Sequence, residues 1–261
     1  MNRKSSLTST LNSISCSFSQ ESDNNSSFHQ IAATKNVLDM YVTYKKRVNR
    51  SYKKLEYFFG EPTPMDVCIR EINKEGLKAI LESKVPLCYF LYYLLDEFCS
   101  ENLLFFLEVE RFESKRLAKR NQNDIALSIY NTYISNNSYL EINLDDRVKR
   151  NITEQLESIL TANNPSEEPS IDRYIFSEAK SCVYLLLESS FNQFLHTCVY
   201  EDMVANCGEL TIYYNDHVKN LALDYLSAFT HKRNYGLSIQ KIIYKFVKDN
   251  FNMDYPEFTK S

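Results

Sequence analysis

The sequence predicts an all-α protein, and three observations lead to this prediction. The chain has 261 residues, 44% of them hydrophobic, which is enough to bury one sizeable core. It holds only 4 Gly and 6 Pro, too few for the tight turns of β-rich folds. Apolar residues recur at steps of three and four along most of the chain, and no segment alternates as a half-buried strand does. We expect a helical bundle with additional flanking helices and a disordered N-terminal tail.

The N-terminal segment is too polar to fold alone. Residues 1–30 include 10 Ser, 2 Thr and 4 Asn, so they bury too little apolar surface to offset the entropy of ordering. We assign residues 1–34 to a disordered, Ser-rich tail. The basic pair Arg3 and Lys4 is followed by polar residues, which argues against a secretory signal, and no stretch approaches the ~18 apolar residues of a membrane span. A cytoplasmic protein is expected.

Residues 35–70 are expected to form a basic amphipathic helix and a linker. The helix has an apolar stripe that includes Leu38, Tyr41 and Val48, and Gly60 with two following prolines ends it. Its cations suit an anionic membrane surface. Two alternatives remain open, which are packing on the core with a solvated basic face and a coiled coil. The candidate membrane-binding residues are Lys45, Lys46, Arg47, Arg50, Lys53 and Lys54.

The remaining helices follow from the same periodicity. Segments 87–95 and 102–112 are too apolar for surface helices and should be central, while Asp145 and Asp146 should cap the helix that follows them. The two prolines in 162–170 predict a surface loop. Other helical patterns run over 66–83 with a pause at Gly76, 125–134, 148–160, 175–187, 191–200, 218–229 and 237–247.

Composition also narrows the chemistry. The seven cysteines are scattered without a C-x-x-C pair, so we interpret them as reduced, mostly buried side chains. Gly-rich phosphate loops are missing from the sequence, and its four histidines suggest no metal site. Glu108, Glu110 and Arg111 are expected to face water. The net charge of −4 gives no reason to expect nucleic acid as a partner. We expect no metal, no cofactor and no catalytic site of the chain's own.

Two polar loops stand between very apolar helices. The first is D-E-F-C-S-E-N, residues 96–102, and the second is L-E-I-N-L-D-D, residues 140–146. Polar residues at helix junctions are often only caps. Together, however, these loops resemble the hallmark segments of the RGS family, the regulators of G-protein signalling. A third block resembling that family starts at Phe176 and ends at Phe194 and Leu195, and the resemblance extends over residues 76–203. We therefore assign 71–203 to an RGS domain and 204–261 to a C-terminal helical extension.

The resemblance implies a function as well as a helical fold. RGS domains bind the switch regions of a GTP-loaded Gα subunit and accelerate its GTP hydrolysis, which dampens signalling. The Gα subunit supplies its own Arg and Gln, so the RGS domain is an activator and not an enzyme. Asn143 corresponds to the residue at the edge of the Gα active site. The Gα-binding residues implied by the resemblance are Glu97, Phe98, Glu101, Asn102, Asn143, Leu144, Asp145, Leu186, Ser189, Ser190 and Gln193.

One segment departs from the family pattern. After Glu188 the family has an Asp that pairs with an Arg one turn later, whereas this chain has Ser189 and Gln193. We expect Gln193 to hydrogen-bond Ser189 or the backbone, without the assistance of charge. The alternative function is therefore an RGS-fold interaction or membrane scaffold module with weak or no activating effect. Phe98 in place of the usual Tyr removes only a hydroxyl.

Overall fold

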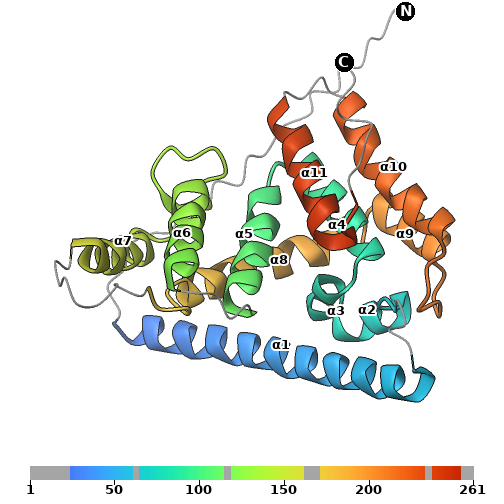
Figure 1. Ribbon diagram of the computed structural model, residues 1–261, viewed down its shortest axis with the longest axis horizontal. Coiled ribbons are helices and arrows are strands. Elements are labelled where there is room, and N and C mark those ends of the chain that lie inside the picture. The colour runs from blue at the N-terminus through green and yellow to red at the C-terminus, as the bar shows by residue number, and fades with distance from the viewer. Residues whose placement is uncertain (1–23, 61–64, 115–118, 162–170, 233–236, 254–261) are drawn as a thin grey trace, which may run out of the picture.

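The computed structural model describes residues 24–60, 65–114, 119–161, 171–232 and 237–253. These residues form eleven α-helices and one π-helical segment, without a strand, which confirms the predicted all-α class (Figure 1). The loop predicted at 162–170 lies outside the described residues. The elements are α1 Asn24–Phe59, α2 Ile69–Glu75, α3 Leu77–Glu82, α4 Val85–Asp96, α5 Ser100–Ser114, α6 Lys119–Ile129, η1 Tyr130–Ile134, α7 Asp146–Thr161, α8 Ser177–Phe194, α9 Cys198–Cys207, α10 Asp216–Lys232 and α11 Leu237–Phe251.

Helix α1 begins earlier than expected. It starts at Asn24, so residues 24–34 are helical and do not belong to the tail assigned to 1–34. Phe28 and Ile31 stand ten and seven residues before Leu38, and they continue the apolar spacing of the helix toward its N-terminus. The Ser content of this segment hid that continuity. The other end agrees with the prediction, because the helix stops at Phe59 and Gly60 follows with a φ of 73°.

Helix α1 packs along one edge of the bundle (Figure 1). Tyr41 is 1% exposed, and its ring meets the ring of Phe106 edge-on at 5.5 Å. The Tyr41 hydroxyl donates a hydrogen bond to Glu82 at 2.7 Å. The apolar stripe of α1 therefore packs against the core. Of the three possibilities considered for this helix, this is the one in which it packs on the core.

Helices α4 and α5 form the centre, as their apolar composition predicted. Every residue of α4 from Val85 to Leu95 is buried. Its first turn is held by Asp66, whose carboxylate accepts hydrogen bonds from the backbone N–H groups of Lys84 and Val85, both at 2.8 Å. These bonds satisfy amides that lack partners within the helix. Phe90 continues the core toward α8, with its ring 5.3 Å from that of Phe194.

A buried ionic cluster connects α5 with α1 and α8. Lys180 of α8 is 5% exposed, and its ammonium group pairs with Glu110 and Glu113 of α5. Lys45 of α1 also pairs with Glu110, and its Nζ lies 3.8 Å from Glu82. Burial by itself would raise the pKa of Glu110, but the charges of Lys180 and Lys45 outweigh it and lower that pKa. The expectation that Glu110 faces water is wrong, because α1 and α8 cover it.

The C-terminal extension covers two further faces of the centre. Helix α10 packs on α4, with the Tyr225 ring 5.1 Å from Tyr89 and 4.7 Å from Tyr92. Helix α11 reaches α5, where Lys245 pairs with Glu108 and Asp249 pairs with Arg111. The prediction of a water-facing Glu108 and Arg111 therefore overlooked α11.

The cysteines differ from the expectation of mostly buried side chains. Cys88 and Cys207 are buried, Cys198 is exposed, and Cys68, Cys99 and Cys182 are half-buried. All six are free thiols. Helical periodicity places them near the core but does not decide how far neighbouring side chains cover them. None of the helices in the described ranges is both long and apolar enough to cross a bilayer.

Helix α7 begins with the cap that the sequence predicted. The Asp145 carboxylate accepts a hydrogen bond from the Arg147 backbone N–H at 2.7 Å, and its carbonyl accepts one from Val148 at 2.9 Å. Asp145 is thus the N-cap. Asp146 lies in the first turn, where its negative charge interacts favourably with the positive end of the helix dipole. The helix start is fixed immediately after Leu144, which is 7% exposed.

We predict that Lys180→Met destabilises the protein by about 3 kcal/mol, because it leaves Glu113 without a cation and Glu110 with only Lys45 in a buried site. Urea unfolding followed by circular dichroism measures this change. Lys46→Met, at an exposed lysine of α1, is the control and should change stability by less than about 0.5 kcal/mol. Equal stability of the two variants would contradict the proposed strength of the cluster.

We predict that Asp145→Ala lowers the free energy of unfolding by about 1 kcal/mol, since the first turn of α7 then loses its side-chain cap. The same urea titration measures it. Glu154→Ala, at an exposed position of the same helix, serves as the control and should remain within about 0.5 kcal/mol of the parent protein. A loss no larger than that of the control would show that the cap contributes nothing.

Candidate functional site

The first candidate loop connects α4 and α5 and presents an aromatic side chain to solvent. Phe98 is 68% exposed and has a φ of 56°, in the left-handed region that residues other than Gly seldom adopt. The turn is closed by hydrogen bonds from the Glu97 N–H to the Tyr93 carbonyl at 3.0 Å and from the Cys99 N–H to the Leu94 carbonyl at 2.9 Å. This tight turn directs Glu97 and Phe98 outward.

Asn102, in the first turn of α5, does not act as the cap considered from the sequence. Its side-chain amide donates to the Cys99 carbonyl and to the Glu101 carboxylate, both at 3.4 Å. Its amide oxygen is buried and meets no donor in the described residues. Burial raises the pKa of Glu101, although a hydrogen bond from its own backbone N–H lowers it. A buried acceptor without a donor is unfavourable in the free protein.

The second candidate loop presents Asn143 between two buried anchors. Ile142 is fully buried and Leu144 is nearly so, whereas Asn143 between them is exposed, which is the alternation of an extended chain. The Ile142 N–H donates to the carbonyl of Tyr133 at 2.9 Å. Tyr133 lies in η1, whose π-helical hydrogen bond runs from the Ser135 N–H to the Tyr130 carbonyl at 2.9 Å. The anchors fix the backbone of the residue that faces solvent.

The C-terminal half of α8 contributes the third group of candidates. Leu186, Ser189 and Gln193 are exposed, and Ser190 is half-buried. Gln193 does not bond Ser189 or the backbone as expected, because its side-chain oxygen accepts a hydrogen bond from the Tyr93 hydroxyl of α4 at 3.3 Å. A half-buried tyrosine hydroxyl needs a polar partner, and Gln193 is the one that it meets.

A second contact joins α8 to the first loop. The Ser190 side chain hydrogen-bonds the thiol of Cys99, and burial raises the pKa of that thiol to about 11. Sequence reasoning did not single out Tyr93, and it placed Cys99 in the first loop without assigning it a contact. The only signal for Tyr93 was a hydroxyl group in an otherwise apolar helical run, because its partner lies 100 residues away along the chain.

The two loops and the end of α8 belong to one region of the bundle. Leu104, one turn after Glu101, and Leu140, three residues before Asn143, line the same cavity. In Figure 1 the loop after α6 projects from the end of the bundle at which α5 begins. Helix α1 lies at the other end, where it meets Glu110 in the second half of α5. The candidate loops therefore face away from α1.

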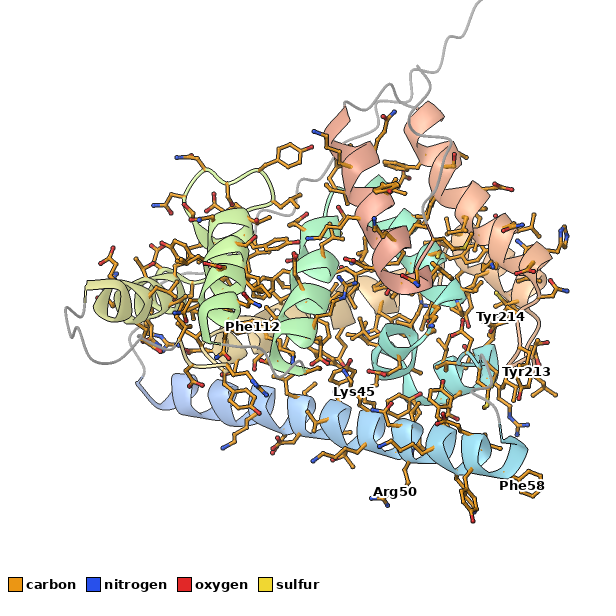
Figure 2. All side chains as sticks on the ribbon, viewed as in Figure 1. Lys45, Arg50, Phe58, Phe112, Tyr213 and Tyr214 are labelled. Carbon is orange, nitrogen blue, oxygen red and sulfur yellow. The ribbon has the colours of Figure 1, made fainter. Side chains whose placement is uncertain are left out.

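The six candidate cations of α1 fall into two groups. Lys45 is turned toward the core (Figure 2). Arg47 pairs with Glu71 at 2.7 Å and with Glu75 at 3.3 Å. Figure 2 shows Arg50 pointing away from the bundle. The cations that are exposed and pair with no acid in the described part of the chain are Lys46, Arg50, Lys53 and Lys54. We call these four residues the outer cations.

Comparison with known proteins identifies the domain that carries the loops. Residues 76–203 match the family model described as "Regulator of G protein signaling domain". The human protein named Regulator of G-protein signaling 20 is 34% identical over 122 residues, which are 46% of this chain and 28% of the relative. Its bovine counterpart is 32% identical over 121 residues, 46% of this chain and 29% of the relative. The match thus covers less than a third of these relatives' lengths.

A shorter relative and two solved structures agree with this assignment. Mouse Regulator of G-protein signaling 13 is 26% identical over 144 residues, which are 54% of this chain and 83% of the relative. The PDZRhoGEF rgRGS domain, solved in a complex with Galpha-13 bound to GTP-gamma-S, aligns with a TM-score of 0.52 at 18% identity. That alignment covers 70% of this chain and 91% of the other. A second structure, the RGS-like domain from PDZ-RhoGEF, aligns with a TM-score of 0.51 at 14% identity over 70% of this chain and 96% of the other.

These structural likenesses show the fold, and the family model adds the sequence pattern of residues 76–203, which contain both candidate loops and the end of α8. Residues 76–203 of this chain are therefore a domain of the RGS family.

Proposed function

We propose that this protein is a GTPase-activating protein for a Gα subunit, binding the switch regions of its GTP-loaded form. The observation that supports this most directly is Asn143, an exposed amide held between two buried anchors within an RGS-family domain. An amide both donates and accepts hydrogen bonds, so Asn143 suits contact with a catalytic glutamine and a backbone group of the partner. Asn102 adds a buried oxygen that a donor from the partner would satisfy.

The activating effect would come from binding and not from a new catalytic group. A Gα subunit has its own Arg and its own water-positioning Gln, so the barrier falls when a partner stabilises the switches in their transition-state arrangement. A rigid surface does this best, because little ordering has to accompany binding. The tight turn at Phe98 and the anchored backbone at Asn143 are rigid features of this kind.

The alternative is an RGS-fold module that binds its partner without activating it. The observation that favours it is that Gln193, at the position where the family has the Arg of an ion pair, makes a neutral hydrogen bond with Tyr93. Neutral hydrogen bonds are weaker than charge-assisted ones, so α8 would be braced less firmly against the partner. This alternative gives binding to GTP-loaded Gα without faster turnover.

We predict that the protein accelerates single-turnover GTP hydrolysis by a Gα subunit and that Asn143→Ala reduces the acceleration by at least about tenfold, or about 1.4 kcal/mol of transition-state stabilisation. Asn136→Ala, an exposed asparagine of the same loop, is the matched control and should retain the parent activity. Binding with no acceleration across the Gα classes would support the non-activating alternative instead.

We also propose that the outer cations bind the anionic inner face of the plasma membrane, so that the protein is cytoplasmic and peripheral. The four residues project from the face of α1 that is opposite the buried stripe, and the neighbouring Tyr57 is 92% exposed. Each cation near an anionic surface contributes roughly 1 kcal/mol. Because the apolar stripe of α1 is packed in the core, this binding would be electrostatic, with the helix surface and not its apolar face in contact with lipid.

We predict that Arg50→Glu with Lys53→Glu lowers partitioning onto vesicles containing phosphatidylserine by about thirtyfold or more, since two cations contribute about 2 kcal/mol. Co-sedimentation measures the partitioning. The control is Arg150→Glu with Lys241→Glu, which changes the net charge equally at exposed positions away from α1. If both pairs reduce binding to the same degree, net charge alone governs it and the outer cations have no special role.

A further inference from the structure

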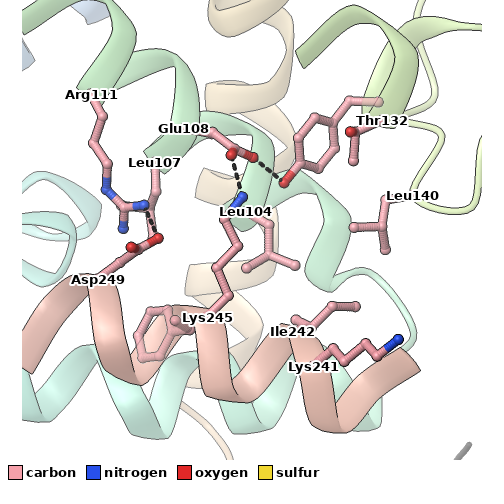
Figure 3. A pocket seen from close by; sticks show the side chains of 12 residues that line it. Leu104, Leu107, Glu108, Arg111, Thr132, Leu140, Lys241, Ile242, Lys245 and Asp249 are labelled. Atoms are coloured by element: carbon pink, nitrogen blue, oxygen red, sulfur yellow. Dashed lines mark hydrogen bonds and ion pairs between the residues drawn. The ribbon is translucent and has the colours of Figure 1, made fainter. Parts of the chain in front are cut away.

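Helix α11 lies outside the family-matched residues 76–203, yet its residues line a cavity together with Leu140 of the loop that carries Asn143. A cavity of about 190 Å³ separates it from α5 and η1. Figure 3 shows Leu140 on the side of the loop and Ile242 on α11, and Leu104 and Leu107 of α5 also line this cavity. The loop residue Leu140 thus shares an apolar environment with a helix that the domain match does not include.

A chain of polar contacts runs from α11 to the base of the same loop. Lys245 pairs with one oxygen of the Glu108 carboxylate, and the Tyr133 hydroxyl donates to the other oxygen at 2.7 Å (Figure 3). Tyr133 is 3% exposed, so its hydroxyl is held where water does not compete well. One carboxylate on α5 therefore connects the C-terminal extension to η1.

Tyr133 passes this constraint to the backbone of the loop. Its carbonyl accepts the hydrogen bond from the Ile142 N–H at 2.9 Å, and Asn143 is the next residue. Its ring also meets Phe105 of α5 edge-on at 5.6 Å. The same residue thus has a side chain fixed by Glu108 and Phe105 and a carbonyl that fixes Ile142. A shift of the Tyr133 backbone would move the carbonyl to which Ile142, the residue before Asn143, is bonded.

We propose that α11 is a positioning element for the Asn143 loop, acting from Lys245 through Glu108 and Tyr133 to the Ile142 backbone. Without Lys245, the second oxygen of the Glu108 carboxylate would face solvent. Lys245 pairs with that oxygen and thereby fixes the rotamer of Glu108, which in turn holds the Tyr133 hydroxyl. The contact between Arg111 and Asp249 docks α11 one turn further along, and neither of its side chains hydrogen-bonds Tyr133 in the described residues. The effect of this device on Gα rests on the proposed function, whereas its effect on the loop does not.

Hydrogen exchange of the Ile142 amide in the full chain tests the loop directly. Tyr133→Phe should speed that exchange by about tenfold, since it removes a buried hydrogen bond to a carboxylate. Lys245→Met should speed it by about threefold, because Lys245 is more than half exposed, and Lys245→Arg should restore the slow rate. Lys241→Met, an exposed lysine on the same helix, is the matched control and should leave the rate unchanged. Amides of α8 should be unaffected in every variant.

Acceleration of Gα hydrolysis should fall by similar factors in the same variants and recover with Lys245→Arg. Unchanged exchange at Ile142 in both Tyr133→Phe and Lys245→Met overturns the positioning role. The positioning role is also overturned if the amides of α8 exchange faster by the same factor as the Ile142 amide, because α11 would then act only on global stability. If exchange rises at Ile142 alone while the parent protein accelerates no Gα subunit, the positioning role stands and the proposed function fails.

Discussion

The structure depends on the carboxylates of α5, a central helix that is not apolar on all sides. Glu110 and Glu113 receive Lys180 from α8, and Glu110 also receives Lys45 from α1. Glu108 receives Lys245 from α11. Buried charges are tolerated only when they are paired, so Glu110 and Glu113 require neighbouring helices in defined places. The helices outside the matched domain are in this way part of its packing.

The fold class and most helices could be predicted from the sequence, because apolar spacing and helix breakers are local signals. Gly60 and Gly76 ended or divided helices as expected, and Asp145 capped α7. The start of α1 could not be placed well, since its first turns contain many Ser and Asn residues. The burial of Glu110 was also missed. Its partner Lys180 lies 70 residues away, and periodicity carries no information about a contact at that distance.

The candidate site shows the same division between local and distant information. Each loop could be recognised from its own residues, and the exposure of Asn143 follows from the apolar residues on either side of it. The contacts behind the loops were not accessible in this way. Gln193 bonds Tyr93, and Cys99 bonds Ser190, in both cases across helices that meet only in the folded chain. The family resemblance pointed to the two loops and the end of α8. Of the residues it implied, Glu97, Phe98 and Asn143 are exposed, whereas Asn102 and Leu144 are buried.

The packing of α1 has a consequence for where the folding unit ends. The matched residues begin at position 76, but Tyr41 fills a space against Phe106 and Tyr184, and its hydroxyl bonds Glu82. A fragment cut at the edge of the match would uncover these rings and leave Glu82 without Lys45. A fragment that keeps this packing therefore has to begin before residue 76, upstream of the family-matched segment.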